Sequence, residues 1–460
     1  VQGQPESSRV PASAMTTTEE MKVKLILHCE NGSPPYLTPA LLATCFPSTS
    51  RAVNDHLVFG IAVRDSCVTP VYKPKEKKPR KTKQKNKSNP PSRQGSTVSD
   101  GVSSVASMSG AKPTGYTFTG RPLHDDLIIP REYNVLACPS FDLIDDGKSG
   151  NNGTKAATAT HKELSLVTPR GHQKLTPSLY REVVEKMEAP TSIGLYDEAS
   201  EENAKRNAKS VERTKLWLEE WTNSSAEMEK VTGHKSKLWA PIVGGADLTL
   251  RLDCIENATR QSSVCGVALI GIHHIADRQA RIALLQSCSK AIPKSMPRAV
   301  LVANSIGEIM DAAQNNGGVQ YIGSSLPALL ARSRRALILD LFGWRNEEGK
   351  DQQDGDGRPK KRPRTEGGAR STKDGCICLE DKAFARDTAP FVEGCPCLAC
   401  TEHKRAYLHH LINAKELLSE ILLFVHNLHH LLSLLQEMTD ATAIGKQMEF
   451  VQHIERQLQS

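Results

Sequence analysis

Short apolar runs alternate with amphipathic segments between residues 160 and 340. The apolar runs lie at 164–167, 192–195, 242–243, 264–272, 299–302, 319–322 and 336–341. Helical patterns lie between them, at 178–188, 201–228, 248–258, 277–291 and 305–316. Two more strand-like stretches lie upstream, at 21–27 and 57–63. Because few hairpin signals separate these segments, the alternation predicts parallel strands joined by crossover helices.

The number of these units favours one α/β fold over another. With the two upstream strands included, it suits a (β/α)8 TIM-like barrel better than an open doubly wound sheet. No glycine-rich dinucleotide fingerprint follows any of the predicted strands. We therefore expect a barrel over residues 21–345 and, after it, a subdomain over 376–460 that ends in helices at about 404–437 and 443–458.

Three segments are too polar to join this core. Residues 1–20 form a polar lead, and residues 73–112 change from lysine and proline to serine and glycine. Residues 346–375 are acidic first and basic afterwards. Such compositions bury too little apolar surface to offset the entropy lost on ordering, so the lead and both inserts are predicted to be disordered.

The positive charge of the chain is concentrated in the first insert. The 460 residues carry a net charge of +7, from 59 basic and 52 acidic side chains. Nine of the basic residues and one acid lie between Lys73 and Lys87, so the remainder holds 50 basic and 51 acidic residues. This distribution excludes a uniformly basic nucleic-acid coat, but it is compatible with a basic arm on a neutral body.

Neither a membrane span nor a secretory leader is expected. The most apolar stretch, at 417–435, is interrupted by polar residues, and the first twenty residues lack an apolar signal region. Seven of the twelve cysteines are scattered singly, which is typical of a reduced cytosolic protein. We therefore expect no transmembrane segment and a cytoplasmic location, with peripheral association at the mitochondrial outer membrane as an open alternative.

The other five cysteines are clustered. Cys395, Cys397 and Cys400 form a C-x-C-x2-C arrangement. Three thiolates at this spacing can converge on one Zn²⁺ ion at about 2.3 Å and leave one tetrahedral position open. Histidine is the expected fourth ligand, and spacing alone does not choose among His409, His410, His426, His429 and His430. Cys376 and Cys378 lie at the edge of the second insert and are predicted not to be ligands.

The residues around these cysteines resemble a known family. The C-x-C-x2-C group is followed by His403, by the run at 405–411, by Glu-Leu-Leu at 416–418 and by His-Asn-Leu at 426–428. This order is similar to the zinc region of the tRNA-guanine transglycosylases. The resemblance implies that His426 is the fourth ligand and that one Zn²⁺ is bound. It extends more weakly to about residue 160, and it implies a barrel with a zinc subdomain inserted near its C-terminal end.

Active members of that family exchange guanine at the wobble position of tRNA for a queuine-type base. One Asp attacks the ribose, and a second Asp serves as acid and base. The resemblance places Gly323 where the family has its nucleophile, and Val243 where it has a base-binding Gln. The segment with the second Asp has no counterpart before Leu175, and the pocket segment is replaced at 271–274. Asp197 matches a base-reading Asp, but without its partners we interpret it as structural.

These losses beside an intact zinc motif imply a non-catalytic chain. The sequence is most similar to the subunit without catalytic activity in the eukaryotic heterodimer. That similarity implies pairing with a catalytic queuine tRNA-ribosyltransferase subunit and with tRNAs that have GUN anticodons. The apolar face of the helix after the cysteines is expected to contact the partner, unless it packs on the chain's own barrel. That face consists of Leu417, Leu418, Ile421, Leu422, Val425, Leu428, Leu432 and Leu435.

Two alternatives remain open on the sequence alone. The first is an active transglycosylase in which a displaced carboxylate, Asp197 or Asp340, serves as the nucleophile. The second is a zinc-stabilised RNA-binding or chromatin factor that acts through its basic inserts, since residues 359–364 resemble a nuclear import signal. A solvated loop is the commoner meaning of such a basic run.

Overall fold

The computed structural model describes twelve stretches of the chain. They are residues 23–29, 57–62, 69–70, 116–117, 122–126, 134–140, 158–168, 171–199, 203–223, 235–314, 318–345 and 374–459. The predicted lead at 1–20, the basic insert at 73–112 and most of the insert at 346–375 lie outside these residues. The domain boundaries assigned to them therefore stay predictions.

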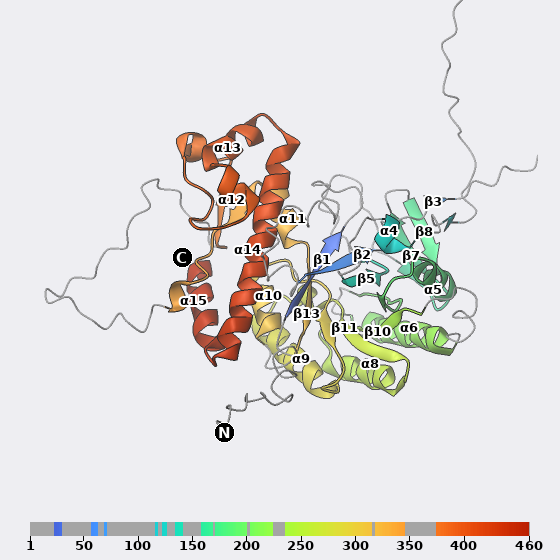
Figure 1. Cartoon of the computed structure of the whole chain (residues 1–460). Helices are drawn as coiled ribbons and strands as arrows, with labels where there is room; N and C mark the ends of the chain where they lie inside the picture. The colour runs from blue at the N-terminus through green and yellow to red at the C-terminus, as the bar shows by residue number, and fades with distance from the viewer. Residues whose placement is uncertain are drawn as a thin grey trace, which may run out of the picture.

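Eight parallel strands form a closed barrel, which confirms the predicted (β/α)8 class (Figure 1). The strands follow one another around the barrel in the order β1-β13-β12-β11-β10-β9-β5-β2. Their bounds are β1 Lys24–Cys29, β2 Leu57–Ala62, β5 Asn134–Cys138, β9 Thr191–Ile193, β10 Lys237–Ile242, β11 Val264–Leu269, β12 Arg298–Val300 and β13 Tyr321–Ser324. Because all pairings are parallel, the carboxyl ends of the strands meet at one mouth, where barrel enzymes place their functional groups.

Helices cover the outside of the barrel between successive strands. They are α5 Pro177–Lys186, α6 Ala204–Asn223, α8 Leu248–Arg260, α9 Arg278–Ala291, α10 Ile306–Ala313 and α11 Leu326–Arg332. Side-chain caps define several starts: the Asp247 carboxylate accepts from two backbone amides of α8, and Asp277 and Ser305 cap α9 and α10. On α6, Val211, Trp217, Leu218 and Trp221 are buried, in agreement with its predicted amphipathic pattern.

Two predicted strands lie outside the barrel. The run at 164–167 forms β7 (Leu164–Thr168), which pairs antiparallel with β6 (Thr158–Ala159) and β8 (Gly171–Leu175). The run at 336–341 forms β14 (Arg335–Leu337), which pairs antiparallel with β15 (Cys376–Cys378). Conversely, the barrel strand β5 was not predicted. An apolar run indicates a buried strand but not the sheet it joins, and the five residues of β5 give a weak signal.

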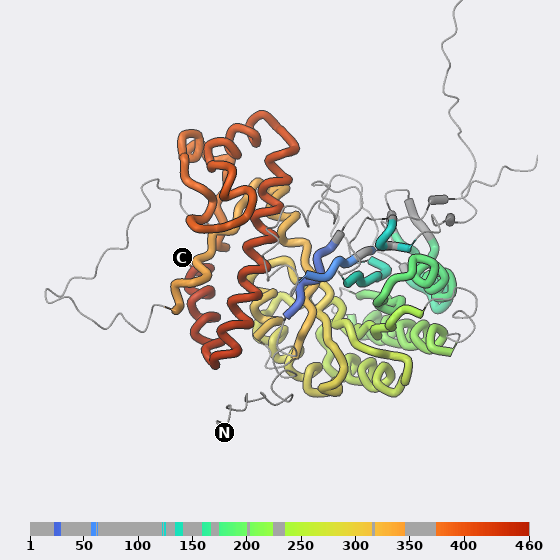
Figure 2. Tube along the Cα trace, viewed as in Figure 1, coloured from blue at the N-terminus to red at the C-terminus, as the bar shows by residue number. Residues whose placement is uncertain are grey.

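Besides β15, the described part of the C-terminal subdomain is built of one short 3-10 helix and four α-helices. They are η3 Lys382–Arg386, α12 Leu398–Glu402, α13 Arg405–Asn413, α14 Leu417–Ala443 and α15 Gln447–Gln459. The single helix expected at 404–437 is wrong, because the chain breaks between α13 and α14, where Lys415 adopts a left-handed φ of 57°. Neither Gly nor Pro marks this break. In Figure 2 the tube of α12 and α13 lies beside the upper half of α14, on the side away from the barrel strands.

The long helix α14 lies between α12 and the barrel helix α11, and it also packs against α15 (Figure 1). Five of the eight apolar residues expected to face a partner are at most 2% exposed: Leu422, Val425, Leu428, Leu432 and Leu435. Most of that face is therefore covered by the chain itself, which was the expected alternative to contact with a partner. Leu417 and Leu418, in the first turn, remain 49% and 40% exposed.

Within the described residues, α14 is also the one helix long and apolar enough to cross a membrane. Buried helices of proteins without membrane spans meet the same criterion, and 72% of its most apolar stretch is buried inside the structure. Its length and composition are therefore weak support for a membrane span.

Candidate metal centre and barrel mouth

Cys395, Cys397, Cys400 and His426 come together into one cluster, with ligand atoms within 4.8 Å of one another. The Sγ atoms of Cys397 and Cys400 lie 3.5 Å and 3.4 Å from Nδ1 of His426. A tetrahedral zinc site with its usual bond lengths separates sulfur and nitrogen ligands by about 3.6 Å. The donor set and its spacing thus fit a metal ion, and among ions they suit zinc.

Local structure fixes each member of this cluster. Cys397 precedes the first residue of α12, Cys400 lies within that helix, and Cys395 lies in the turn before it. His426 is fully buried in α14, and the edge of Phe391 packs on its ring. The Nε2–H of His426 donates to the carbonyl oxygen of Leu337 in β14 at 2.7 Å. This hydrogen bond sets the tautomer that leaves the Nδ1 lone pair for a metal ion.

The side chains of the cluster shift one another's pKa values. Hydrogen bonds from Cys397 and Cys400 lower the pKa of Cys395, and hydrogen bonding to Cys395 raises the pKa of Cys397. Burial alone would lower the pKa of His426, but hydrogen bonds with Cys395 and Cys400 raise it to about 9. A metal ion that binds here must therefore displace protons from the thiols and the imidazole.

The other histidines named from the sequence lie outside the four-ligand cluster. His409 hydrogen bonds to the carbonyl oxygen of Leu379 and to Asn413, and His410 is exposed. Nδ1 of His429 lies 3.8 Å from Cys395 Sγ, and burial lowers the pKa of His430 to about 3. Of these five histidines, His426 is thus the one that lies in the cluster with the three cysteines, and its role as a ligand stays a prediction.

Cys376 and Cys378 also lie outside the cluster, in β15. Burial raises the pKa of the Cys376 thiol to about 12, so this side chain stays protonated. That the pair does not ligate a metal stays a prediction.

At the barrel mouth, Gly323 of β13 has no room for a side chain. A Cβ atom on this residue would lie 1.8 Å from the carbonyl oxygen of Leu301 and 2.7 Å from Nε2 of His28. His28, on β1, fills the adjacent space: its Nε2–H donates to the Leu301 carbonyl, and its Nδ1 accepts from the Ser325 hydroxyl. Burial lowers the pKa of His28 to about 3, so the ring is neutral.

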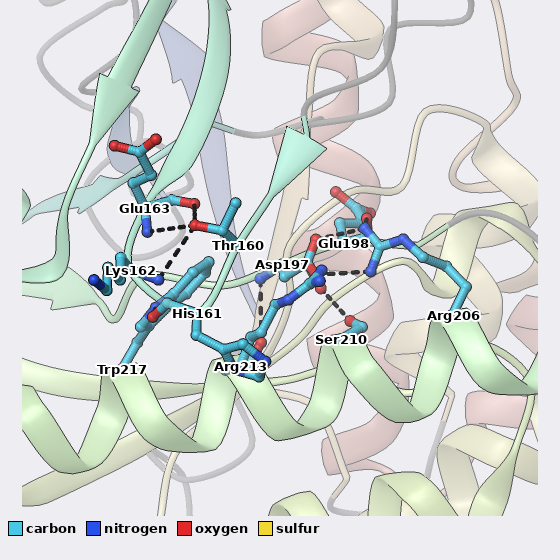
Figure 3. A network of polar contacts seen from close by, with 11 residues as sticks. Thr160, His161, Lys162, Glu163, Asp197, Glu198, Arg206, Ser210, Arg213 and Trp217 are labelled. Carbon is cyan, nitrogen blue, oxygen red and sulfur yellow. Dashed lines mark hydrogen bonds and ion pairs between the residues drawn. The ribbon is translucent and has the colours of Figure 1, made fainter.

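Neither of the two displaced-carboxylate candidates is available in the mouth. Both oxygens of Asp197 are bound by Arg206 at 2.6 Å and 2.7 Å, and Arg213 adds a bond of 2.9 Å. Figure 3 shows these two arginines rising from α6 to the buried carboxylate. Asp340 follows β14, outside the barrel, and accepts from the amides of Phe342 and Gly343. The ion pairs with Arg206 and Arg213 are compatible with the interpretation of Asp197 as structural, which stays a prediction.

Three polar residues of the mouth were not predicted as a group. Glu198 follows β9, and His273 and His274 lie in η1 (Ile272–His274) after β11. Their ligand atoms lie within 4.8 Å of one another. The sequence signal for them is a pair of adjacent histidines just after a barrel strand, which the sequence analysis noted only as a departure from the family pattern.

Comparisons with known proteins bear on the whole arrangement. The profile of the family described as "Queuine tRNA-ribosyltransferase" matches residues 144–460, which include five barrel strands and the metal cluster. The chain belongs to this family. The match covers the subdomain to its end, whereas β1, β2 and β5 precede it.

Individual relatives in the family carry one name, "Queuine tRNA-ribosyltransferase accessory subunit 2". The protein from Culex quinquefasciatus is 26% identical over 295 residues, which is 62% of this chain and 63% of its own length. The Xenopus laevis protein is 30% identical over 264 residues, or 55% and 62% of the two chains, and the Drosophila yakuba protein is 27% identical over 351 residues, or 73% of each. The match thus spans less than two thirds of the Culex and Xenopus proteins.

Proposed function

We propose that this chain is the non-catalytic subunit of a heterodimeric queuine tRNA-ribosyltransferase. It supports the exchange of guanine for queuine at the wobble position of tRNAs with GUN anticodons, and the covalent chemistry belongs to a catalytic homologue. The observation that carries this proposal is the filled space at Gly323. The shared name of the relatives gives independent support.

The argument from Gly323 is one of geometry. A nucleophilic carboxylate must approach the anomeric carbon to within about 3–3.5 Å, and a misplacement of about 1 Å already costs about 100-fold in rate. If Gly323 occupies the family's nucleophile position, that position has neither an oxygen nor space for one, because the Leu301 carbonyl and His28 occupy it. The binding of Asp197 by two arginines removes the nearest substitute.

The cofactor in this proposal is one structural Zn²⁺ per chain, held by Cys395, Cys397, Cys400 and His426. When bound, zinc supplies a tetrahedral cross-link and no open position for substrate. The four residues then join the turn before α12 to the middle of α14. The hydrogen bond from His426 to Leu337 extends that connection to β14.

The partner surface in this proposal is the outer end of the subdomain. Four large apolar side chains are exposed there: Leu398, Tyr407, Leu417 and Leu418 are between 38% and 49% exposed. They belong to α12, α13 and the first turn of α14, the elements next to the cysteines. Exposed apolar groups on neighbouring elements are typical of a subunit contact. The location that fits this function is the cytoplasm, and the mitochondrial outer membrane remains an open alternative.

An exchange assay tests the proposal directly. The full chain is purified alone and together with the catalytic homologue from the same organism, and incorporation of labelled guanine into a tRNA with a GUN anticodon is measured. We expect no incorporation by the chain alone and incorporation by the co-purified pair. Exchange by the isolated chain, or failure of the two proteins to co-purify, would contradict the proposal.

A further inference from the structure

Glu198, His273 and His274 bring three metal-ligating groups together at the barrel mouth, apart from the cysteine cluster. Oε1 of Glu198 lies 3.3 Å from Nε2 of His274, and the rings of the two histidines are 3.9 Å apart between centroids. One ligand atom of each residue lies within 4.8 Å of those of the other two. The carboxylate follows β9 and the imidazoles follow β11, so the closed barrel assembles the group from separate loops.

The separation between Glu198 and His274 is that of two ligands on one ion. A tetrahedral ion with oxygen and nitrogen ligands at about 2.0–2.2 Å places them about 3.4 Å apart. Two imidazoles and one carboxylate form a donor set that zinc and other divalent transition metals prefer. They supply three ligands, so such an ion keeps at least one open coordination position.

The backbone approaches these residues closely at a glycine. Gly271, directly before the 3-10 turn, has a φ of 70° in the left-handed region that favours glycine. A Cβ atom on Gly271 would lie 3.3 Å from Oε1 of Glu198 and 3.6 Å from the His274 ring. Any larger residue would therefore crowd the space around the Glu198 and His274 side chains.

Burial and charge also suit a cation. The side chain of Glu198 is 2% exposed and that of His274 is 17% exposed, so the carboxylate is enclosed while the imidazole side reaches solvent. A buried carboxylate is costly unless a positive charge compensates it. Arg251 interacts electrostatically with Glu198, while its guanidinium donates to the carbonyl oxygens of Ile242, Gly245 and Ile270.

We propose that Glu198, His273 and His274 bind a divalent transition-metal ion, for which Zn²⁺ is the best-fitting candidate. The site is separate from the cysteine cluster and does not depend on the proposed function. His28 is not part of it, because both of its ring nitrogens are engaged by Leu301 and Ser325. A ligand with an oxygen or nitrogen donor would complete the shell at the open coordination position.

Metal stoichiometry of the full-length chain tests this site without any assay of activity. The protein is equilibrated with Zn²⁺, desalted, and analysed by mass spectrometry for zinc per chain. We expect two ions in the wild type and one in His274→Gln and in Glu198→Gln. The matched control is His161→Gln, an exposed histidine outside the cluster, which should keep both ions. A wild-type chain that holds one ion, or a His274→Gln chain that holds two, would overturn the proposal.

Cobalt distinguishes the two sites by spectroscopy. A Co²⁺ ion among thiolates gives intense sulfur charge-transfer absorption, whereas one bound by nitrogen and oxygen gives weak bands in the visible range. In Cys400→Ala the mouth site should still take up Co²⁺ and show only the weak bands. Substituting a residue that only supports a metal ligand already costs about 10- to 100-fold in metal affinity. Removing the ligand His274 in His274→Gln should therefore raise the Kd for Co²⁺, measured from these weak bands, by at least about 100-fold. Identical titrations of Cys400→Ala with and without His274→Gln would refute the assignment.

Discussion

Cys400 Sγ and His426 Nδ1 lie 3.4 Å apart, although one belongs to the short helix α12 and the other to the middle of α14. The same imidazole donates through Nε2 to Leu337 of β14. The side chain next in sequence, Asn427, accepts from the amide of Leu337 and donates to the carbonyl oxygen of Arg335. A metal ion bound here would therefore connect α12, α14 and, through the hydrogen bond of His426, β14. Its loss should destabilise the junction between the subdomain and the barrel.

The first prediction concerns the ligands themselves. We expect Cys400→Ala to lose the zinc of the cysteine cluster and to lower the melting temperature, because structural zinc contributes its binding free energy to folding. Zinc content and thermal unfolding by circular dichroism measure both effects. Cys378→Ala, in β15 outside the cluster, is the control and should retain the zinc. Equal zinc content in the two variants would show that Cys400 is not a ligand.

A second prediction concerns thiol reactivity. With metal bound, alkylation at about pH 8 should modify the exposed Cys265 and spare Cys395, Cys397 and Cys400, since bound thiolates are shielded. After chelation, the three ligands should become reactive. Cys376 should stay unmodified in both cases, because it is buried and its pKa is about 12. Peptide mass spectrometry locates the labels, and labelling of the three cysteines before chelation would count against metal binding.

The third prediction concerns the space at Gly323. Gly323→Ala should lower the free energy of unfolding by about 3 kcal/mol or more, because the added Cβ meets a backbone carbonyl that cannot move independently. Gly307→Ala is the matched control: no atom lies within 4 Å of its added Cβ, and in α10 the exchange should change stability by less than about 1 kcal/mol. Denaturant unfolding measures both. Equal stability of the two variants would show that the mouth has room at residue 323.

The fourth prediction concerns alkaline pH. Burial raises the pKa of the Cys254 thiol from 9.0 to about 11, against the weaker lowering effects of a hydrogen bond with the Val243 backbone and of the charges of Arg251 and Lys215. Below pH 9 both states keep the proton. Between about pH 9 and 11 the unfolded chain releases it first, so the free energy of unfolding should fall by up to about 1.4 kcal/mol per pH unit.

Removal of this thiol isolates its contribution. In Cys254→Ala the free energy of unfolding should fall less steeply above pH 9, by up to about 1.4 kcal/mol per pH unit. The loss of packing should lower the free energy of unfolding equally at every pH. Denaturant unfolding between about pH 8 and 11 measures the two slopes. Parallel curves for the wild type and the variant would show that Cys254 ionises equally in both states.

The barrel and the cysteine cluster were predictable for different reasons. Repeated strand and helix units predict a (β/α)8 barrel because the 2.0 and 3.6 residue periods alternate many times, so one weak strand does not change the result. Three cysteines within six residues predict a metal site because they share one local turn. The choice of His426 among five histidines needed the family resemblance, since several of them reach the same helical face.

Other features depend on contacts between distant residues. Glu198 and His274 belong to loops on two different strands, and only the closed barrel brings them together. The filled space at Gly323 depends on a carbonyl of the neighbouring strand's loop and on His28 from the opposite end of the sequence. The break between α13 and α14 has no Gly or Pro to mark it in the sequence, and it lies where Lys415 adopts a left-handed φ.

The β14–β15 pair has a practical consequence for protein engineering. Its two strands hold the chain together on either side of residues 346–373, and the amide of Ile338 also donates to the carbonyl of Gly375 at 2.9 Å. Closing a longer loop costs only about 0.6 kcal/mol for each doubling of its length. An affinity tag or a fluorescent reporter inserted between these strands should therefore leave the fold intact, and it would label the molecule without touching either terminus.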